Sequence, residues 1–321
     1  MNQMLAFLET AEKTDIRFPG LGIVLRKIGS GFTVFGFRIA FYGVVIGTAM
    51  ILGYLLADQV AKRTGQNRED YLDFTIWAVI LSVIGARVYF VIFNWKVFAD
   101  DPLSVFNLRT GGLAIYGGVI VGILTAIVFT KIRKLNRKLF LDTAVVGLLT
   151  GQIIGRWGNF FNRECFGTYT NGPLRMLIDA REVGDYYSPL VTESIVTNAY
   201  ADKPKALEKI LEIRNNPVVL EGTTYISVHP TFLYESLWNL VLLILMLIRT
   251  KHKKFDSEIF WMYLFGYGLG RFWIEGLRTD QLFLFGTSIA VSQLLSALLV
   301  AGSLIGYIYC YRKNKSKLLA K

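Results

Sequence analysis

The stretch IAFYGVVIGTAMILGYLLA, residues 39–57, contains no charged side chain. A helix needs about 20 mainly apolar residues to cross the hydrocarbon core of a bilayer. Further runs of similar length carry at most two charges each, and they cover residues 74–93, 113–130, 139–155, 230–248, 259–276 and 282–311. A buried soluble core accounts for one or two such runs, but not for seven. We therefore predict an all-α polytopic membrane protein with about seven transmembrane helices.

The overall composition agrees with this class. The chain has 321 residues, of which 53% are hydrophobic and only 18% are charged. Its mean hydropathy is +0.43. Soluble domains of this length rarely reach such values.

The chain has a net charge of +11, and the positions of its cations follow a pattern. Nearly half of the lysines and arginines lie in four segments, residues 62–68, 131–138, 249–254 and 312–321. If the N-terminus lies outside, all four segments face the cytoplasm, as the positive-inside rule requires. We expect a multi-pass protein with its N-terminus outside and its C-terminus in the cytoplasm. The charge then needs no nucleic-acid partner.

The apolar runs and the polar insertion divide the chain into segments. We expect an N-terminal outer segment (1–36), transmembrane helices 1–4 (37–167), an extracytoplasmic head domain (168–228), transmembrane helices 5–7 (229–311) and a basic cytoplasmic tail (312–321). The first segment does not resemble a cleaved signal peptide, and an amphipathic helix on the membrane surface is one arrangement for it. Within the insertion, residues 204–214 alternate apolar and charged side chains at helical spacing.

The cysteine count argues against a disulfide framework. Cys165 and Cys310 fall on opposite sides of the membrane in this topology, so they cannot pair. Two cysteines so placed form no cysteine metal site either.

The first polar cluster is GQIIGRWGNFFNRECFG, residues 151–167. It places Arg156, Asn159, Asn162 and Glu164 at the outer end of the fourth predicted helix. Arginine offers a planar fork of donors to an anionic oxygen pair. The alternative is that the glycines serve helix packing and the arginine extends to the interface. The density of polar groups favours a binding site.

The second cluster lies on the sixth predicted helix. Tyr267, Arg271, Glu275 and Arg278 fall in one stripe at about 100° per residue. An Arg271–Glu275 pair would neutralise itself, which is the structural alternative. Even so, Arg278 is left over to bind an anion.

The third cluster is HPTFLYE, residues 229–235. His229 stands where an outer loop enters the membrane, beside a buried Glu235. A lone histidine is often structural, and here the structural and functional interpretations are nearly balanced.

Smaller features complete the set. Tyr42 begins the first helix, and glycine pairs at 111–112 and 117–118 flank Tyr116. Arg87 lies within an apolar run and must have a partner. The arginines of the first two clusters converge near the outer leaflet, and this predicts a phosphate ligand. In that location the natural phosphate is a phospholipid headgroup.

With these residues laid out, the chain resembles the prolipoprotein diacylglyceryl transferase family of the bacterial plasma membrane. Residues 155–167, 229–235 and 267–278 are similar to three blocks of the family, and the resemblance runs from about residue 38 to residue 311. The first 36 residues and the head domain are less diagnostic.

The resemblance implies a fold and a reaction. The family moves the diacylglyceryl group of phosphatidylglycerol onto the thiol of the lipobox cysteine in a prolipoprotein signal peptide, and glycerol phosphate leaves. This is the first step of bacterial lipoprotein maturation. No metal or organic cofactor is implied. The partners are phosphatidylglycerol, the prolipoprotein and membrane lipid, and the fold is a seven-helix body with an outer head.

Residue roles follow from the resemblance and the chemistry. Arg156 and Arg271 are expected to stabilise the leaving phosphate in a low-dielectric site. Tyr116 stands where many members have a histidine named as the general base, yet an ordinary tyrosine titrates near pH 10 and is a poor base. Either neighbouring arginines shift the pKa of Tyr116, or Tyr116 only hydrogen-bonds the lipid, or the reaction needs no side-chain base. The expected substrate-binding residues are Tyr42, Asn159, Asn162, Glu164, Gly167, His229, Glu235, Tyr267, Glu275 and Arg278.

Two other function classes remain. A lipid flippase or anion transporter would bind a phosphate with the same arginines and release it unchanged, although the chain lacks the internal repeat common in transporters. A structural helper of secretion machinery would not require three polar clusters on one side of the membrane. We interpret Cys165 as a packing residue, because the family's thiol comes from the substrate.

Overall fold

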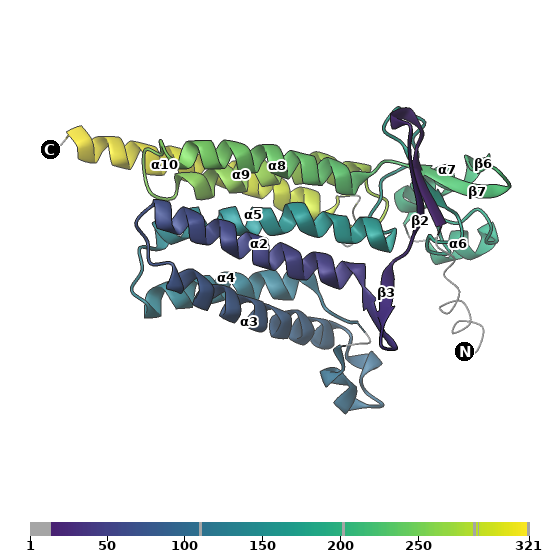
Figure 1. The fold of residues 1–321 in the computed structure, drawn as a ribbon, viewed down its shortest axis with the longest axis horizontal. Coiled ribbons are helices and arrows are strands. Elements are labelled where there is room, and N and C mark those ends of the chain that lie inside the picture. The colour runs from purple at the N-terminus through teal and green to yellow at the C-terminus, as the bar shows by residue number, and fades with distance from the viewer. Residues whose placement is uncertain (1–13, 109–110, 201–202, 285–286, 288, 320–321) are drawn as a thin grey trace. The chain divides into compact units, whose positions relative to one another are not determined.

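The computed structural model describes residues 14–108, 111–200, 203–284, 287 and 289–319 (Figure 1). The chain divides into two compact units. The first comprises residues 1–52, 148–255 and 261–321, and the second comprises residues 53–147 and 256–260.

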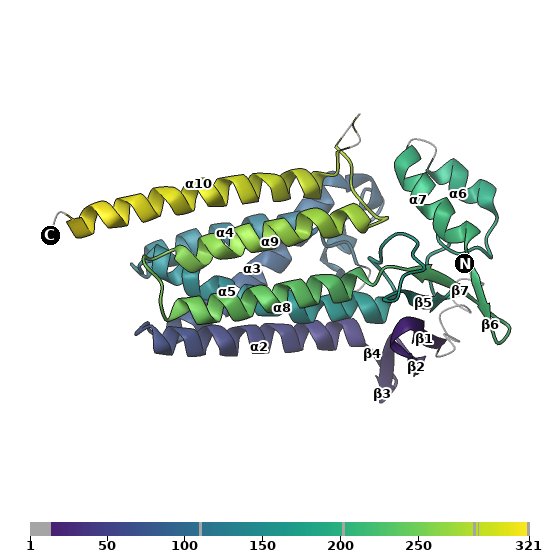
Figure 2. The ribbon, with the colours of Figure 1, turned by 90° about the horizontal axis from the view of Figure 1, so that it is seen from above.

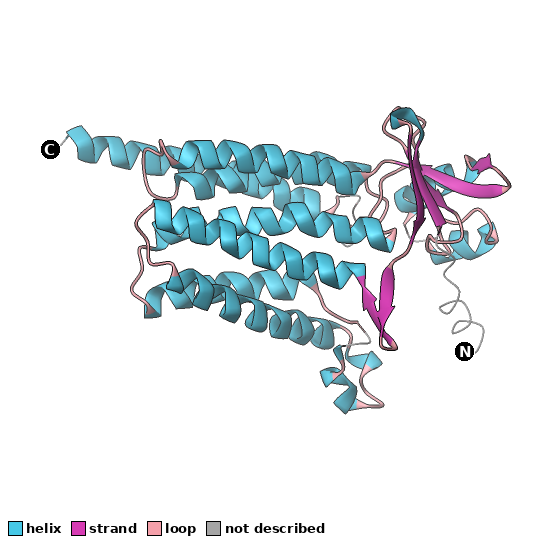
Figure 3. Ribbon diagram, in the orientation of Figure 1, coloured by secondary structure: helices cyan, strands magenta, loops and turns pink. Residues whose placement is uncertain are grey.

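Long helices dominate the described chain (Figure 3). They are α2 (Phe41–Arg63), α3 (Glu69–Phe93), α4 (Ile115–Ile132), α5 (Arg137–Asn162), α8 (Thr231–Thr250), α9 (Glu258–Leu277) and α10 (Val291–Leu319). Six helices within the described residues are long and apolar enough to cross a bilayer, and α9 is not among them. Arg271 and Glu275 lower the hydropathy of α9. The prediction of a polytopic, mainly helical membrane protein is confirmed, and the count of seven spans stays a prediction.

Side chains of α8 contact the backbones of α5 and α9, two helices that lie beside it in the first unit (Figure 2). Ser236 on α8 donates a hydrogen bond to the Ile153 carbonyl of α5 at 3.0 Å. Trp238 on α8 donates one to the Gly266 carbonyl of α9 at 2.8 Å. A Cβ atom at Gly270 would lie 2.2 Å from the Trp238 indole nitrogen. Small residues of this kind let membrane helices approach closely.

The first unit also contains an antiparallel sheet with strand order β2-β1-β5-β7-β6. We use the name head for this sheet and the segments 168–228 connected to it, and its place outside the membrane stays a prediction. The strands are β1 (Thr14–Phe18), β2 (Ile23–Ile28), β5 (Met176–Asp179), β6 (Val218–Leu220) and β7 (Thr223–Val228), with η1 (Pro19–Leu21) between the first two. The helices α6 (Glu193–Ala199) and α7 (Pro204–Asn215) belong to the same insertion, and α7 confirms the helical spacing seen in the sequence.

The N-terminal segment differs from one expectation. Residues 14–34 form strands and a short 3-10 turn rather than an amphipathic helix, while residues 1–13 lie outside the described residues. Strand β1 buries alternate side chains and pairs with β5 through Arg17 and Leu177. A period of two is the pattern of a half-buried strand. The N-terminal segment and the insertion therefore share one sheet.

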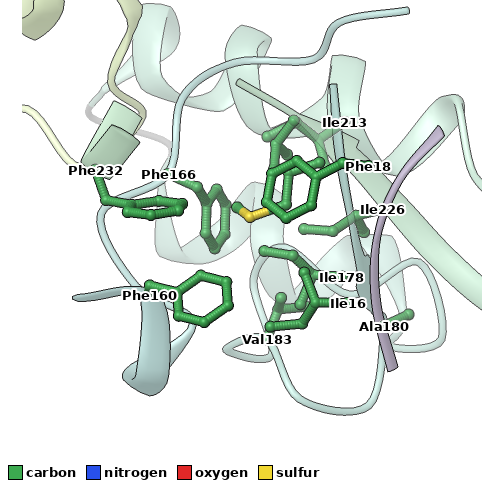
Figure 4. Close-up of a cluster of buried hydrophobic side chains, with 12 residues drawn as sticks. Ile16, Phe18, Phe160, Phe166, Ile178, Ala180, Val183, Ile213, Ile226 and Phe232 are labelled. Carbon is green, nitrogen blue, oxygen red and sulfur yellow. The ribbon is translucent and has the colours of Figure 1, made fainter. Parts of the chain in front are cut away.

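The core of the head continues into the helix ends (Figure 4). Ile178 and Ile226 from the sheet belong to the same buried cluster as Phe160 of α5 and Phe232 of α8. Phe166 lies between these two groups. The hydrophobic cluster thus fixes the head to the ends of the two helices that carry the first and third polar clusters.

A separate hairpin, β3 (Gly31–Val34) and β4 (Phe37–Ala40), leads directly into α2. Two-stranded hairpins are marginally stable alone. This one is attached through Phe41, whose ring centroid lies 5.6 Å from that of Phe32 and 5.0 Å from that of Phe161 on α5.

Arg87 organises the second unit, where α3 and α4 pack side by side (Figure 1). It is 5% exposed. Its guanidinium donates five hydrogen bonds of 2.6 to 3.0 Å to the carbonyl oxygens of Ser104, Val105, Asn107, Gly111 and Gly112. These bonds hold the loop that contains η2 (Trp95–Val97) and η3 (Pro102–Phe106). The expectation that Arg87 has a partner is confirmed, and the partner is main chain.

We predict that Arg87→Gln loosens this loop. Losing a charged fork leaves several carbonyls unsatisfied, so proteolytic cleavage within residues 95–108 should accelerate roughly tenfold or more. Arg133→Gln is the matched control, since Arg133 pairs with Asp73 on the surface and exposed pairs contribute little. Equal cleavage rates in the two variants would contradict the structural role.

Candidate functional site

Glu235 lies at the centre of the candidate site. It belongs to the second turn of α8 and is 3% exposed. Its Oε1 lies 2.6 Å from Nη2 of Arg156 on α5, an ion pair without hydrogen-bond geometry. Its Oε2 accepts a hydrogen bond of 3.2 Å from Nη1 of Arg271 on α9. One buried carboxylate therefore joins the two arginines predicted to bind phosphate.

Arg271 is held from a second side as well. Its Nη2 lies 2.6 Å from Oε2 of Glu275, one turn further along α9. The Arg271–Glu275 pair, which is the structural alternative for the second cluster, is thus present, and the substrate-binding role of Glu275 stays a prediction. Between two carboxylates the guanidinium has little rotational freedom, and its plane is fixed.

Arg278 is not the unpaired cation that the spacing suggested. Its Nε and Nη2 donate hydrogen bonds of 2.8 and 2.5 Å to the two carboxylate oxygens of Asp280. Its Nε also lies 4.0 Å from Glu275. Asp280 follows the end of α9 at Leu277, so no helical periodicity could have paired it with Arg278. The substrate-binding role of Arg278 stays a prediction.

A chain of hydrogen bonds leads from Arg156 to the rim of the site. Arg156 Nη1 donates to Oδ1 of Asn159 at 3.4 Å. The amides of Asn159 and Asn162 both donate to Oε1 of Glu164, at 2.9 and 3.2 Å. The structure thus brings the whole first cluster together, with Arg156 half-buried and Glu164 exposed.

Two predicted tyrosines flank the Arg156 turn of α5. The ring of Tyr42 packs against Gly158, where a Cβ atom would lie 2.7 Å from the ring. Tyr267 on α9 stacks on Tyr263 with ring centroids 5.6 Å apart, and its hydroxyl interacts with the Arg156 guanidinium. Glycine at position 158 is required for the close approach of the Tyr42 ring.

His229 and Gly167 form a structural junction where the head meets the helices. The Gly167 amide donates to the His229 carbonyl at 2.9 Å. His229 Nδ1 lies 3.1 Å from the Tyr234 hydroxyl. Burial lowers the pKa of His229, because it disfavours the charged imidazolium. The imidazole is therefore neutral near pH 7, and these contacts support the structural interpretation of His229.

Tyr116 lies in the other compact unit, as the second residue of α4. It is half-buried. Its catalytic role stays a prediction from the resemblance.

Sequence reasoning missed Lys209 of the head. Its Nζ donates three hydrogen bonds of 3.0 Å, to the carbonyls of Gly276 and Arg278 and to Oε1 of Gln281. The last carbonyls of a helix have no partner within the helix and carry partial negative charge. Lys209 therefore caps α9, and no signal in the sequence connects it to a helix so far along the chain. Burial lowers the pKa of Lys209.

Cys165 lines a cavity of about 260 Å³ beside the rim, with Glu164, Glu182, Tyr187, Thr279 and Asp280 among its other lining residues. Burial raises the pKa of the Cys165 thiol to about 11. Since the thiolate is the reactive form, this thiol stays protonated near neutral pH. That supports its interpretation as a packing residue.

The chain is similar to one characterised family over most of its length. The sequence profile described as prolipoprotein diacylglyceryl transferase matches residues 30–309. A relative from Clostridioides difficile named phosphatidylglycerol--prolipoprotein diacylglyceryl transferase is 36% identical over 287 residues, which cover 89% of this chain and 97% of the relative. A relative of the same name from Halalkalibacterium halodurans is 38% identical over 279 residues, covering 87% of this chain and 84% of the relative.

We predict that Lys209→Met loosens the end of α9. The methionine keeps the apolar stem but removes three hydrogen bonds, so amide exchange across residues 274–281 should rise roughly tenfold. Lys205→Met is the control, because Lys205 is exposed on the same helix. Lys209→Arg should restore much of the protection, since it keeps charged donors. Unchanged exchange in Lys209→Met would contradict the capping role.

Proposed function

Because this chain belongs to the prolipoprotein diacylglyceryl transferase family, we propose that it transfers the diacylglyceryl group of phosphatidylglycerol to the lipobox cysteine of a prolipoprotein. The observation that supports this most directly is the pair of arginines held by the buried Glu235 carboxylate. Two fixed guanidiniums at a membrane helix junction suit a lipid phosphodiester.

The proposed reaction is a displacement at a glycerol carbon. The substrate thiol sulfur forms a bond to that carbon, and the bond from the carbon to the phosphate oxygen breaks. The electron pair of the broken bond leaves on that oxygen. The proton of the thiol balances the charge of the released glycerol phosphate, so no oxidant, reductant or cofactor is required.

Arg156 and Arg271 stabilise the leaving phosphate in this scheme. Each guanidinium has five N–H donors, and Glu235 and its neighbours engage only part of each fork among the described contacts. The arginines Arg156, Arg271 and Arg278 are matched in number by Glu235, Glu275 and Asp280. Phosphate recognition therefore depends on oriented donors rather than on a net positive charge, and oriented donors act strongly where water is excluded.

The same guanidiniums favour ionisation of the incoming thiol. Hydrogen bonds donated to a thiolate favour the charged form and lower the pKa of the thiol, and the thiolate is the nucleophile. The Asn159–Glu164 chain of hydrogen bonds would hold Arg156 in place while the peptide approaches. Tyr116 is proposed to hydrogen-bond the lipid.

The membrane arrangement belongs to the same proposal. The 20-residue helix α9 would be the seventh span, shielded from lipid at Arg271 by its ion pairs. The cation distribution supports an outside N-terminus and a cytoplasmic C-terminus in the bacterial plasma membrane. The head would then lie on the outer face, where a secreted prolipoprotein presents its lipobox.

The test uses the purified chain in detergent with phosphatidylglycerol and a lipobox peptide. We expect the peptide to gain a diacylglyceryl mass, with stoichiometric release of glycerol phosphate. Intact peptide and intact lipid, beside an active control enzyme, would contradict the transferase assignment and favour lipid transport.

Lysine replacements test the arginine fork. Lysine keeps the charge but not the planar pair of donors, so Arg156→Lys and Arg271→Lys should each lower kcat by about 100-fold or more. Arg133→Lys, on an exposed ion pair of the other unit, should retain wild-type turnover. Full activity of both site variants would remove the fork from the mechanism.

Tyr116→Phe tests the tyrosine. The variant keeps the ring and deletes only the hydroxyl, so a lost hydrogen bond to lipid should lower kcat/KM by about tenfold. If the hydroxyl were instead the general base, its loss would lower kcat/KM by more than tenfold and change the pH profile of the reaction. Wild-type turnover would exclude any role of the hydroxyl.

A further inference from the structure

The β3–β4 hairpin has one face that is entirely apolar. Its register pairs Phe32 with Ile39 and Val34 with Phe37. Paired residues and alternate residues of a strand share a face, so these four side chains lie together. Thr33 pairs with Arg38 on the opposite face. All four apolar side chains are exposed within the chain.

The tip of the hairpin adds a fifth exposed apolar side chain. Phe35 is 97% exposed. Phe35 and Gly36 have φ values of 49° and 80° and form the two-residue turn. Such turns favour asparagine followed by glycine, and a bulky residue with positive φ is strained. An aromatic side chain is thus kept at a position where it costs conformational energy and contacts nothing in the chain's own core.

The position of the hairpin indicates what covers this face. Strand β4 ends at Ala40 and α2 begins at the next residue. The apolar face is therefore continuous with a helix that is long and apolar enough to cross a bilayer, and Phe32 packs on Phe41 at the start of that helix. A surface adjoining the start of a membrane span lies at the level of the lipid headgroups.

We propose that the hairpin face formed by Phe32, Val34, Phe37 and Ile39 rests on the lipid surface of the leaflet in which α2 begins, with Phe35 reaching the acyl chains. The opposite face places Arg38 toward headgroups and water, where its charge suits anionic phospholipids. The unpaired edge groups of a two-stranded sheet exclude a position deep in the hydrocarbon.

This arrangement connects the lipid surface to the candidate site around Arg156. Phe41 contacts both the hairpin and Phe161 of α5, and Tyr42 packs on Gly158 beside Arg156. The hairpin would fix the start of α2 at the depth of the lipid phosphates that the arginines bind. The membrane contact itself does not depend on the proposed transferase activity.

Spin labels measure the contact directly. Single cysteines replace Phe37, Thr33 or Val219 of the head strand β6 in the full chain carrying Cys165→Ala and Cys310→Ala. Each labelled protein is placed in nanodiscs of phosphatidylcholine and phosphatidylglycerol. We expect the label at 37 to collide mainly with oxygen, and the labels at 33 and 219 mainly with a water-soluble nickel chelate. The proposal would be overturned if the nickel chelate collided with the label at 37 as often as with the label at 219.

Two further results decide the occupant. Phe35→Asn provides the favoured turn sequence while removing the ring, so the hairpin should persist and the nickel accessibility at 37 should rise about threefold. No rise would contradict the role of Phe35. In the alternative outcome, the label at 37 is shielded from both reagents and shows dipolar broadening that grows with the number of copies per nanodisc. That result would assign the face to a second copy of the chain and overturn the lipid assignment.

Discussion

The buried carboxylate of Glu235 is the constraint on which the site depends. A lone carboxylate in a membrane helix is costly, and so is a lone guanidinium. Each becomes tolerable only when it is paired, and breaking a buried pair leaves an uncompensated charge. Glu235 satisfies two arginines from two other helices at once. The two ion pairs therefore favour a packing of α5, α8 and α9 that brings both guanidiniums to one place.

The head extends this constraint beyond the three helices. Its hydrophobic cluster includes Phe160 and Phe232, which lie at the ends of α5 and α8. Lys209 holds the end of α9 through three hydrogen bonds. The three helices that carry the charged cluster are thus each attached to the head at the same end.

Much of this architecture is readable in the sequence, because the bilayer imposes simple patterns. Apolar runs predict the long helices, and polar residues within them are rare enough to mark the site. The Arg271–Glu275 pair, which the i, i+4 spacing gives as the structural alternative for the second cluster, is present. The catalytic role of Tyr116 still rests on the family resemblance alone.

Long-range contacts are what the sequence does not reveal. Asp280 pairs with Arg278 after the helix has ended, and Lys209 reaches α9 from a distant segment. The N-terminal strand does show alternating burial at Thr14, Ile16 and Phe18. Its partner β5 lies far along the chain, so the alternation alone could not place it in the head.

Turnover of the Glu235→Gln variant shows whether the carboxylate orients the two arginines, because the substitution separates charge from geometry. It makes the site more positive by one unit, which by charge alone should strengthen phosphate binding. We instead expect both arginines to lose their fixed orientation, so that kcat with phosphatidylglycerol and a lipobox peptide falls by about 100-fold or more. Wild-type or increased turnover would contradict the account, since phosphate recognition would then need only positive charge.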